Sequence, residues 1–576
     1  MSKNSIILLL ISAIIGITPA HADTPLTAPE LGAASNFQVG AAPRKQRVVE
    51  EMGLDDLRDG LRWGDIEPAA GQLSFEQKSG QTILELARKG LLGSVTIHPS
   101  NPAFSQGNTA TSPDEIREFA AYGAAVAQQL PDIRIEVANE FNGRGFVKGP
   151  ARDMTPAGRA ELLAQMLQAL GAAGVPRDRV IGGAAHSIAA GFLWTVLDAG
   201  GADHMSALAI HPYTTAPEAL PRQIEVLRRH PDAARLDIEI TEIGTTATGR
   251  ATDYLWRNYC QMALSDVRRV VWYPLELRQD GYAPLLDADL RPTETGRAFQ
   301  RIRTDFMGQP VRAYNPDPFT YGCIFDDRTL VVWGAPRQVQ VTDDTITASS
   351  GTGAPIEGDI RLHRDRVLVL ERDAPPEQGT MEEVITLGPL SLQADSFDQF
   401  SFPTEPVATV PADQDAATGF ERAFLRHGRT LPIRTCPGQD RPQAPWFPYL
   451  CSDDAARTVL HDRGFALGGT AQDPVTIRHR FVAPRDMQVD VAVVTDINPN
   501  SADGVTLSLV HNDTPRQSLR ASGKEDHIFD SFAARAGDVI DILLEPGKTP
   551  KGDAGKFRIS LYDRKDPGAD QAIPED

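Results

Sequence analysis

The chain is short of basic residues and, after its N-terminus, of long apolar runs. It has 57 Lys and Arg against 77 Asp and Glu, so its formal net charge is -20 over 576 residues. Proteins that bind the phosphate backbone of nucleic acid carry the opposite balance, and we expect no nucleic-acid partner. A membrane-spanning helix needs about 20 consecutive, mostly apolar residues. Because no internal stretch comes near that length, we also expect no stable insertion into a membrane.

Recognisable cofactor and metal motifs are missing as well. The sequence has no P-loop, no dinucleotide-binding glycine fingerprint and no serine elbow at a strand–helix turn. Zinc ligands usually come in closely spaced pairs, whereas the cysteines here are few and irregularly spaced: Cys260, Cys323, Cys436 and Cys451. We therefore expect neither a cofactor nor a metal site. The sequence leaves the oligomeric state open.

The first 22 residues are typical of a secretory signal peptide. Lys3 precedes an apolar segment, Ile6 to Ile17, and Ala20-His21-Ala22 gives the small-x-small pattern of a cleavage site, which makes Asp23 the expected mature start. We expect an exported protein, periplasmic or secreted, in a compartment where cysteines can oxidise. Cys436 and Cys451 bracket a Pro-rich loop and are candidates for a local bridge.

What the chain does have is the composition of an ordinary globular protein, with 41% apolar and 23% charged residues. Up to about residue 306, short apolar runs alternate with amphipathic helical patterns. We predict eight strands: Phe37–Gly40, Leu57–Leu61, Leu92–His98, Ile133–Asn139, Val180–Gly183, Ala207–His211, Leu236–Thr241 and Arg269–Leu275. Eight strand–helix units predict the α/β class and a (β/α)8 TIM barrel, which typically takes about 250 residues.

After the barrel the helical periodicity stops and short strands with turns follow. Runs at Thr329–Trp333, Gln338–Val341, Asp359–Leu362 and Arg366–Leu370 predict a small β-sandwich. Later runs predict a second, jelly-roll-like β-sandwich. We divide the chain into a signal peptide (1–22), the barrel (23–310), a β-sandwich (311–402), a linker (403–420) and a C-terminal β-sandwich (421–576), a candidate carbohydrate-binding domain.

Two glutamates stand at strand ends, where the chemistry of a TIM barrel is usually found. The run Ile133–Ala138 leads into Asn139 and Glu140, and Leu236–Thr241 leads into Glu242. By our count these are the fourth and seventh strands, which face each other across the barrel mouth. Retaining hydrolysis of a glycosidic bond needs such a pair. One carboxyl group protonates the leaving oxygen, and the other, about 5–5.5 Å away, attacks the anomeric carbon.

At these residues the sequence resembles the clan A retaining glycoside hydrolases, in which Asn-Glu ends strand four and Glu ends strand seven. Flanking segments resemble family 39 and its neighbours: Arg58-Asp59, Arg62-Trp63, Ile66-Glu67-Pro68, Gly71, Phe75, Asn101-Pro102-Ala103-Phe104, His211-Pro212-Tyr213 and Trp272-Tyr273. The nearest resemblance is to family 39-like, exopolysaccharide-associated glycosidases with a β-sandwich behind the barrel. It covers roughly residues 36–400. Phe141 departs from it, since many relatives have proline after Asn-Glu.

The resemblance implies roles for the matching residues. Glu140 would be the general acid/base and Glu242 the nucleophile. Asn139 would bind the 2-hydroxyl of the sugar, and Arg58 would hold the nucleophile ionised.

Further substrate contacts are expected from other strand ends. By the same resemblance, His211 and Tyr213 would orient the nucleophile and the substrate, and Trp272 would offer an apolar platform. His98, at the end of strand three, is either a substrate contact or a structural cap. We expect Glu136 and Glu239, which lie inside the two glutamate-bearing runs, to point elsewhere or to pair with Arg134.

These observations predict an exported retaining β-glycosidase that acts on a polysaccharide, an exopolysaccharide of a biofilm matrix or a cell-surface polysaccharide, by endo cleavage. An exo-acting, β-xylosidase-like enzyme of the same clan is the first alternative, and the shape of the barrel mouth distinguishes the two. The second alternative is a non-catalytic glycan-binding matrix protein on a degenerate barrel. Retention of both glutamates, Asn139 and Arg58 argues against it.

Overall fold

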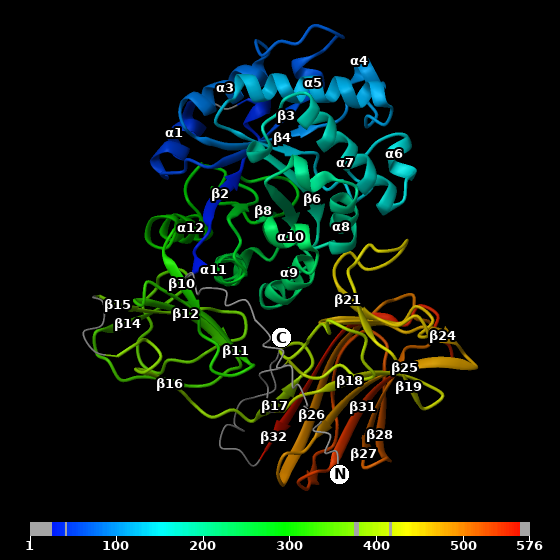
Figure 1. Ribbon diagram of the computed structural model, residues 1–576. Coiled ribbons are helices and arrows are strands. Elements are labelled where there is room, and N and C mark those ends of the chain that lie inside the picture. Colours follow the sequence, from blue (N-terminus) through cyan, green and yellow to red (C-terminus); the bar gives the residue numbers. More distant parts are fainter. Residues whose placement is uncertain (1–25, 41–42, 374–378, 414–417, 565–576) are drawn as a thin grey trace, which may run out of the picture.

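The computed structural model describes residues 26–40, 43–373, 379–413 and 418–564. The predicted signal peptide therefore lies outside the described residues. Figure 1 shows three parts: a barrel surrounded by helices, a smaller antiparallel region, and a larger β-structure at the C-terminal end. None of the described helices combines the length and the apolar character that a membrane crossing requires.

A closed parallel barrel forms the N-terminal part, as the sequence predicts. Within residues 26–40 and 43–373, eight strands close in chain order: β2 (Glu30–Ala34), β3 (Leu57–Arg62), β4 (Leu92–His98), β5 (Arg134–Val137), β6 (Val180–His186), β7 (Ala207–His211), β8 (Asp237–Ile243) and β9 (Arg269–Trp272). The barrel closes because β9 pairs with β2 in parallel register. All strands therefore end at the same mouth of the barrel.

The helices begin at the capping signals that the sequence carries. In α5 (Pro113–Gln129) the side chain of Ser112 accepts from the N–H of Glu115, and the Glu115 carboxylate accepts from the N–H of Ser112. Thr155 caps α7 (Pro156–Ala172). The remaining longer helices are α1 (Pro43–Glu51), α3 (Lys78–Arg88), α8 (Ala190–Asp198), α9 (Leu220–Arg228), α11 (Ala251–Leu264) and α12 (Glu294–Asp305). Short helices lie at α2 (Trp63–Ile66), α4 (Pro102–Ser105), α6 (Pro150–Asp153) and α10 (Pro231–Arg235).

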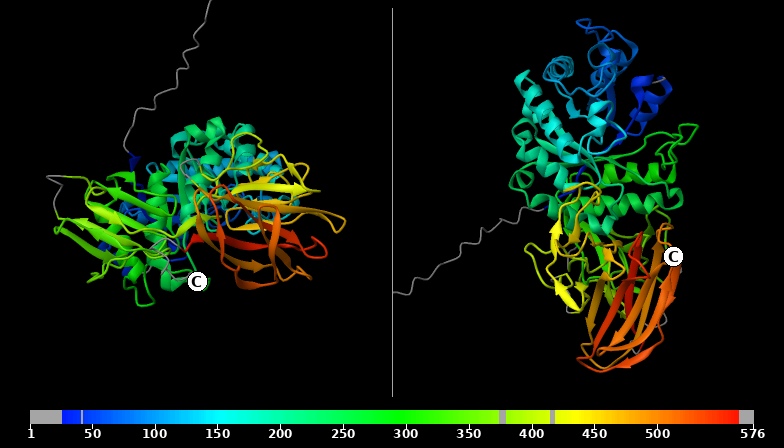
Figure 2. Two further views of the ribbon diagram at one scale, coloured as in Figure 1. Left: turned by 90° about the horizontal axis from the view of Figure 1, so that it is seen from below. Right: turned by 90° about the vertical axis from the view of Figure 1, so that its right-hand side faces the viewer.

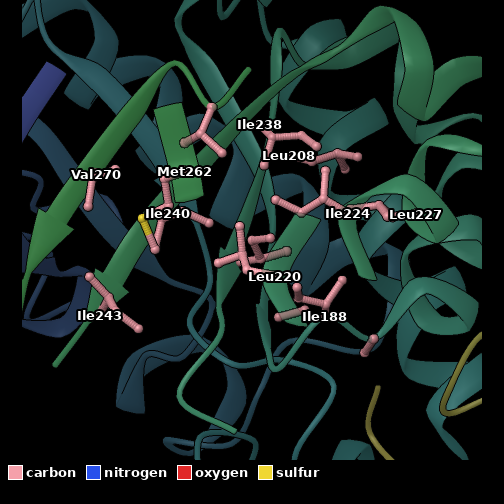
Figure 3. Packing of buried hydrophobic residues seen from close by; sticks show 14 of the residues in the cluster. Ile188, Leu208, Leu220, Ile224, Leu227, Ile238, Ile240, Ile243, Met262 and Val270 are labelled. Carbon is pink, nitrogen blue, oxygen red and sulfur yellow. The ribbon is translucent and has the colours of Figure 1, made fainter. Parts of the chain in front are cut away.

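The barrel core lies between the outer faces of the strands and these helices. Figure 3 shows Leu208 and Ile238, from β7 and β8, near Ile224 of α9, all buried in one cluster. Burying a side chain of this size stabilises the fold by about 1.5–3 kcal/mol. Side chains alternate along a strand, so the neighbours of these outward-facing residues point into the barrel. The polar residues described below lie there.

The first strand is not where the sequence predicts it. Phe37–Val39 forms a short 3-10 helix, and the strand is β2 at Glu30–Ala34. Residues 31–34 are Leu-Gly-Ala-Ala, small side chains with weak strand propensity, and they are held extended by pairing with β3 and β9 on either side. Phe37 is fully buried, and its N–H donates to the carboxylate of Asp59 at 2.5 Å.

The middle part is an antiparallel sheet beside a smaller one. In the described residues the larger sheet has the order β1 (Leu26–Thr27), β10 (Pro310–Ala313), β11 (Thr320–Phe325), β12 (Thr329–Gly334), β15 (Leu368–Arg372) and β14 (Ile346–Ser350), and the smaller pairs β13 (Val339–Val341) with β16 (Ile385–Leu387). The expected strand at Asp359–Leu362 is wrong, since this segment makes only an isolated bridge between Arg361 and Gln338. A disulfide, Cys260–Cys323, joins α11 to β11.

The C-terminal part consists of two antiparallel sheets in the described residues. One contains β20 (Arg434–Cys436), β21 (Tyr449–Cys451), β22 (Val459–His461), β23 (Gly464–Ala466), β32 (Ala554–Asp563), β26 (Met487–Ile497), β29 (Lys524–Ile528), β17 (Leu392–Asp395) and β30 (Phe532–Ala534). The other contains β19 (Arg429–Leu431), β18 (Glu421–Arg426), β25 (Asp473–Val482), β31 (Val539–Pro546), β27 (Val505–His511), β28 (Thr514–Ala521) and β24 (Gly469–Thr470). β17 falls in the range that the sequence assigns to the middle sandwich, yet it pairs with β32.

The C-terminal part packs directly against the barrel. Arg222 of α9 pairs with Asp462 at 3.3 Å. A loop between β20 and β21, residues 437–448, is closed by the Cys436–Cys451 disulfide, and we refer to it as the disulfide loop. It reaches the start of α8, where Gly191 donates its N–H to the carbonyl of Gly438 at 3.0 Å. Figure 2 shows this segment, in yellow, beside the barrel from two further sides.

Candidate active site

The two predicted glutamates sit on irregular backbone at the barrel mouth. Ala138 and Glu140, just after β5, have φ values of 67° and 41°, a left-handed region that non-glycine residues rarely adopt. In β8 the register shifts between Ile240 and Ile243, so the successive residues Thr241 and Glu242 both reach the interior. Such local strain is concentrated at functional sites.

Glu242 is held at both carboxylate oxygens. Arg58 donates Nη1–H to Oε1 at 2.6 Å, and the hydroxyl of Tyr213 donates to Oε2 at 2.9 Å. Nδ1 of His211 is 3.7 Å from Oε2. The side chain of Glu242 is 14% exposed, so its carboxylate is accessible but fixed in orientation.

Arg58 connects the glutamate to the residues beneath it. Its Nε donates to Glu136 at 2.5 Å and its Nη2 to the side-chain oxygen of Asn139 at 3.0 Å. Burial disfavours the guanidinium charge, but the ion pairs with Glu136 and Glu242 outweigh it and raise the pKa of Arg58 above its usual value. Glu136 therefore points into the barrel and pairs with Arg58, so the expectation that it points elsewhere or pairs with Arg134 is wrong. Glu239 pairs with Arg134, as the sequence suggests.

Glu140 has a different environment from Glu242. Its Oε1 lies 3.0 Å from Nδ1 of His186, at the end of β6, and 3.1 Å from Nδ1 of His211, at the end of β7. Its side chain is 16% exposed. The carboxyl groups of Glu140 and Glu242 thus differ in their partners, histidines for one and an arginine with a tyrosine for the other.

The hydrogen bonds of His211 show that it shares a proton with Glu140. Thr241 gives its only hydroxyl hydrogen to Glu136 at 2.6 Å, so at 3.0 Å it accepts from Nε2–H of His211. Nδ1 of His211 and Oε1 of Glu140 are 3.1 Å apart, so one of these two atoms must carry a further proton that forms the hydrogen bond between them. Burial opposes a charge on His211, but the nearby carboxylates of Glu242, Glu136 and Glu140 raise the pKa of His211 to about 9. Burial likewise opposes a charge on Glu140, yet His186 and His211 lower the pKa of Glu140 to about 2, which places the proton on His211.

Glu140, Glu242 and His211 lie close enough to act together. One carboxylate oxygen from each glutamate and one ring nitrogen of His211 lie within 4.8 Å of one another. That spacing of carboxylate oxygens suits retaining enzymes, whose carboxyl groups are about 5–5.5 Å apart, and not inverting ones at about 6.5–9.5 Å. Three such groups can also bind a metal ion, but both ring nitrogens of this histidine carry hydrogens for Thr241 and Glu140, so it has no lone pair to offer.

His98 lies at the same mouth but outside this cluster. It lines an open pocket of about 570 Å³ at the ends of β3 and β4, together with Arg62, Phe146 and Lys148. Burial and the nearby charge of Arg58 lower the pKa of His98 to about 4, so it is neutral at pH 7. Of its two predicted roles, the pocket position favours a contact with substrate.

Trp272 does not form the predicted platform. It is fully buried, its indole N–H donates to the carbonyl of Ala283 at 3.0 Å, and it packs against Tyr254 of α11. Alternation along β9 explains this: Arg269 points into the barrel, so Trp272 three positions later points outward. Aromatic rings near Glu242 come instead from Tyr213 and Tyr282, whose centroids are 5.3 Å apart.

Two residues at the site escaped the sequence analysis. The expected fifth strand ended at Gly183, but β6 continues to His186 through a register shift between Gly182 and Ala185, so a strand-end histidine was missed. Trp446 comes from the disulfide loop, and its ring lies 5.3 Å from that of His186. Its position depends on packing between distant segments, for which the local sequence contains no signal.

The fold and the site define a (β/α)8 barrel with two facing glutamates at its mouth. No protein-family model and no curated protein matches the chain. Similar solved structures include a family 39 glycoside hydrolase from Bacteroides cellulosilyticus, at 17% identity and a TM-score of 0.49 over 60% of this chain and 81% of that one. A GH30 endoxylanase from Clostridium papyrosolvens matches at 13% and 0.44, over 61% and 98%. A GH39 β-xylosidase from Caulobacter crescentus matches at 13% and 0.43, over 60% and 96%.

At such identities these names describe those proteins only. The chemistry of this chain has to come from its own residues.

Proposed function

We propose that the protein is an exported retaining β-glycosidase that cleaves within an exopolysaccharide or cell-surface polysaccharide. The observation that carries this proposal is the pair Glu140 and Glu242, whose carboxylate oxygens approach within 4.8 Å at the barrel mouth. Their environments differ in the way that two roles require, because one shares a proton with a histidine and the other faces an arginine.

In the first step Glu242 attacks the anomeric carbon and the glycosidic bond breaks. Arg58 and Tyr213 hold its two oxygens, so the carboxylate is fixed in position and correctly aimed. Glu140 gives a proton to the leaving oxygen. Glu140 first receives this proton from Nδ1 of His211, across the 3.1 Å hydrogen bond. The transfer occurs as negative charge develops on the leaving oxygen. The product is a glycosyl ester on Glu242.

In the second step water replaces the ester. Glu140, now ionised, takes a proton from the water, whose oxygen attacks the anomeric carbon and releases Glu242 as a carboxylate. The proton returns to the Glu140–His211 pair, so the site ends the cycle as it began. Two displacements at the same carbon give retention of configuration.

Cleavage within a chain is supported by the room at the barrel mouth. The pocket that His98 and Phe146 line opens at the ends of β3 and β4, and neither glutamate lines it, so the mouth offers surface for more than one sugar. Export is supported by the signal-like N-terminal sequence and by the Cys260–Cys323 and Cys436–Cys451 disulfides.

The test combines substitution with chemical trapping. We expect Glu242→Gln and Glu140→Gln to lower kcat on a polysaccharide by at least about 100-fold, the lower bound for losing a positioned acid, base or nucleophile. A 2-fluoro glycoside should label Glu242 in the wild type, detected by peptide mass spectrometry.

Glu85→Gln, a substitution of a half-exposed glutamate on α3, is the matched control and should leave kcat unchanged. The proposal is falsified if Glu242→Gln hydrolyses polysaccharide as fast as the wild type. Release of single sugars only, without intermediate oligosaccharides, would favour exo action.

A further inference from the structure

We propose that Trp446, which belongs to the C-terminal part, is a sugar-binding platform on the leaving-group side of the candidate active site in the barrel. This inference rests on the proposed glycosidase function. It assigns a substrate contact to a segment outside the barrel.

The disulfide loop that carries Trp446 is anchored on the barrel at two points. Gly438 accepts the N–H of Gly191 at 3.0 Å at the start of α8. Gln439 accepts from the side-chain amide of Asn142 at 2.8 Å, and Asn142 stands two residues after Glu140. The loop is therefore positioned relative to the acid/base segment itself.

The indole of Trp446 lies against that segment. A Cβ placed on Gly143 would be 3.2 Å from Cη2 of Trp446 and 3.4 Å from the carbonyl oxygen of Glu140. The ring is also perpendicular to His186, with centroids 5.3 Å apart, and His186 contacts the carboxylate of Glu140 at 3.0 Å. Glycine at position 143 thus lets a ring from another domain approach the acid/base.

Trp446 is exposed where the other large indoles are not. It is 38% exposed, whereas Trp63, Trp256, Trp272 and Trp333 are fully buried and Trp194 is partly buried. An exposed apolar ring beside His186, which contacts the carboxylate of Glu140, is a surface on which the C–H face of a sugar can pack, because an aromatic side chain offers a large apolar area at low cost in conformational entropy.

The position of Trp446 relative to the two glutamates selects the subsite. A general acid must reach the glycosidic oxygen, and the part of the substrate beyond that oxygen is the leaving group. The contacts of Trp446 are with His186 and Gly143, both next to Glu140, while the rings near Glu242 are Tyr213 and Tyr282. The ring therefore faces the leaving group, and not the sugar that Glu242 attacks.

Comparing two kinds of substrate tests this assignment. Xylohexaose, cellohexaose and mannohexaose fill the leaving-group side, whereas the corresponding β-glycosyl fluorides leave it unoccupied. We expect Trp446→Ala to lower kcat/KM on the hydrolysed hexasaccharide about tenfold, the factor that 1.4 kcal/mol represents. On the fluoride, kcat/KM should stay within about twofold, since the chemical step is intact. Trp446→Phe should recover most of the loss.

Ile528→Ala removes another exposed apolar side chain of the same domain and should change neither value. Equal losses on both substrates, or no loss on the hexasaccharide, overturn the proposal. Failure of the wild type on every hexasaccharide and fluoride, together with failure on exopolysaccharide and cell-surface polysaccharide, refutes the glycosidase function instead. The platform is then decided by fluorescence: protection from acrylamide quenching by a hexasaccharide should occur in the wild type and not in Trp446→Phe. Protection that is absent, or equal in both, overturns it.

Discussion

At the scale of single residues, the site depends on one guanidinium with three partners. Arg58 contacts Glu136 below, Asn139 to the side and Glu242 above, and it is almost completely buried. A lysine has no planar fork and cannot reproduce these three directions. The same residue therefore supports the fold and orients the nucleophile.

Replacing Arg58 should reduce both stability and activity. In Arg58→Met the fully buried Glu136 loses the arginine with which it forms an ion pair, and breaking a buried pair from one side costs about 3–5 kcal/mol. We expect the free energy of unfolding, from guanidinium titration, to fall by that amount. Arg117→Met, which breaks an exposed pair with Asp114 on α5, should change it by less than about 1 kcal/mol. Similar effects of the two substitutions would contradict the structural role of Arg58.

His211 should make the stability of the protein pH-dependent. Its pKa is raised from 6.5 to about 9, so its contribution is complete below pH 6.5 and is lost as the pH rises through 9. The loss is on the order of 3 kcal/mol, because each pKa unit corresponds to about 1.4 kcal/mol. Urea unfolding at pH 6, 7.5 and 9 should show this decline in the wild type and not in His211→Gln.

His427→Gln provides the control for this measurement. The imidazole of His427 is 67% exposed and forms an ion pair with Asp473, so the variant should show the same decline as the wild type. If His211→Gln also loses stability between pH 6.5 and 9 to the full extent, the proton is not held where we place it.

At the scale of strands and loops, periodic patterns were predictive and irregularities were not. Seven of the eight barrel strands coincide with apolar runs of the sequence. The capping box of α5 can be predicted from the four residues Ser112 to Glu115. The residues that complete the site depend on departures from regularity: the register shift in β6 that brings in His186, and the one in β8 that turns Glu242 inward. A one-residue shift reverses which face a side chain points to, and no local propensity encodes it. Applying strict alternation to β9 would have excluded Trp272 from the site.

The disulfide loop offers a test at the scale of one element. We expect Cys436→Ala/Cys451→Ala to lower the free energy of unfolding of this region by about 3 kcal/mol, the entropy of closing a loop of some 15 residues. Because the loop then holds Trp446 less firmly, kcat/KM on a hexasaccharide should fall while kcat/KM on the glycosyl fluoride is retained.

The second disulfide supplies the matched control. Cys260→Ala/Cys323→Ala removes a bridge between α11 and β11, away from the barrel mouth. It should destabilise the protein as well, but without changing the ratio of the two kcat/KM values. Two results would show that the disulfide loop does not contribute to substrate binding. One is a changed ratio of the two kcat/KM values in Cys260→Ala/Cys323→Ala, and the other is an unchanged ratio in Cys436→Ala/Cys451→Ala.

At the scale of the whole molecule, the three parts share contacts that the domain ranges of the sequence do not suggest. One hydrophobic cluster runs from the barrel through Trp333 of the middle sheet to Phe424 of the C-terminal sandwich. The indole N–H of Trp333 donates to Glu218 of the barrel at 2.8 Å. The presence of a barrel followed by β-rich parts could be predicted, because each has its own periodicity. Which strand pairs with which could not, since β1 and β17 pair with β10 and β32, which lie more than 150 residues further along the chain.

The place of β32 has a consequence for biosynthesis. This strand, residues 554–563, pairs with β26 on one side and with β23 and β17 on the other, so the last described strand of the polypeptide occupies an interior position. A ribosome retains the most recently made residues in its exit tunnel. Strands β23 and β26 therefore have no shared partner at the centre of this sheet until residues 554–563 have left the tunnel, so the sheet cannot be completed before that point of synthesis.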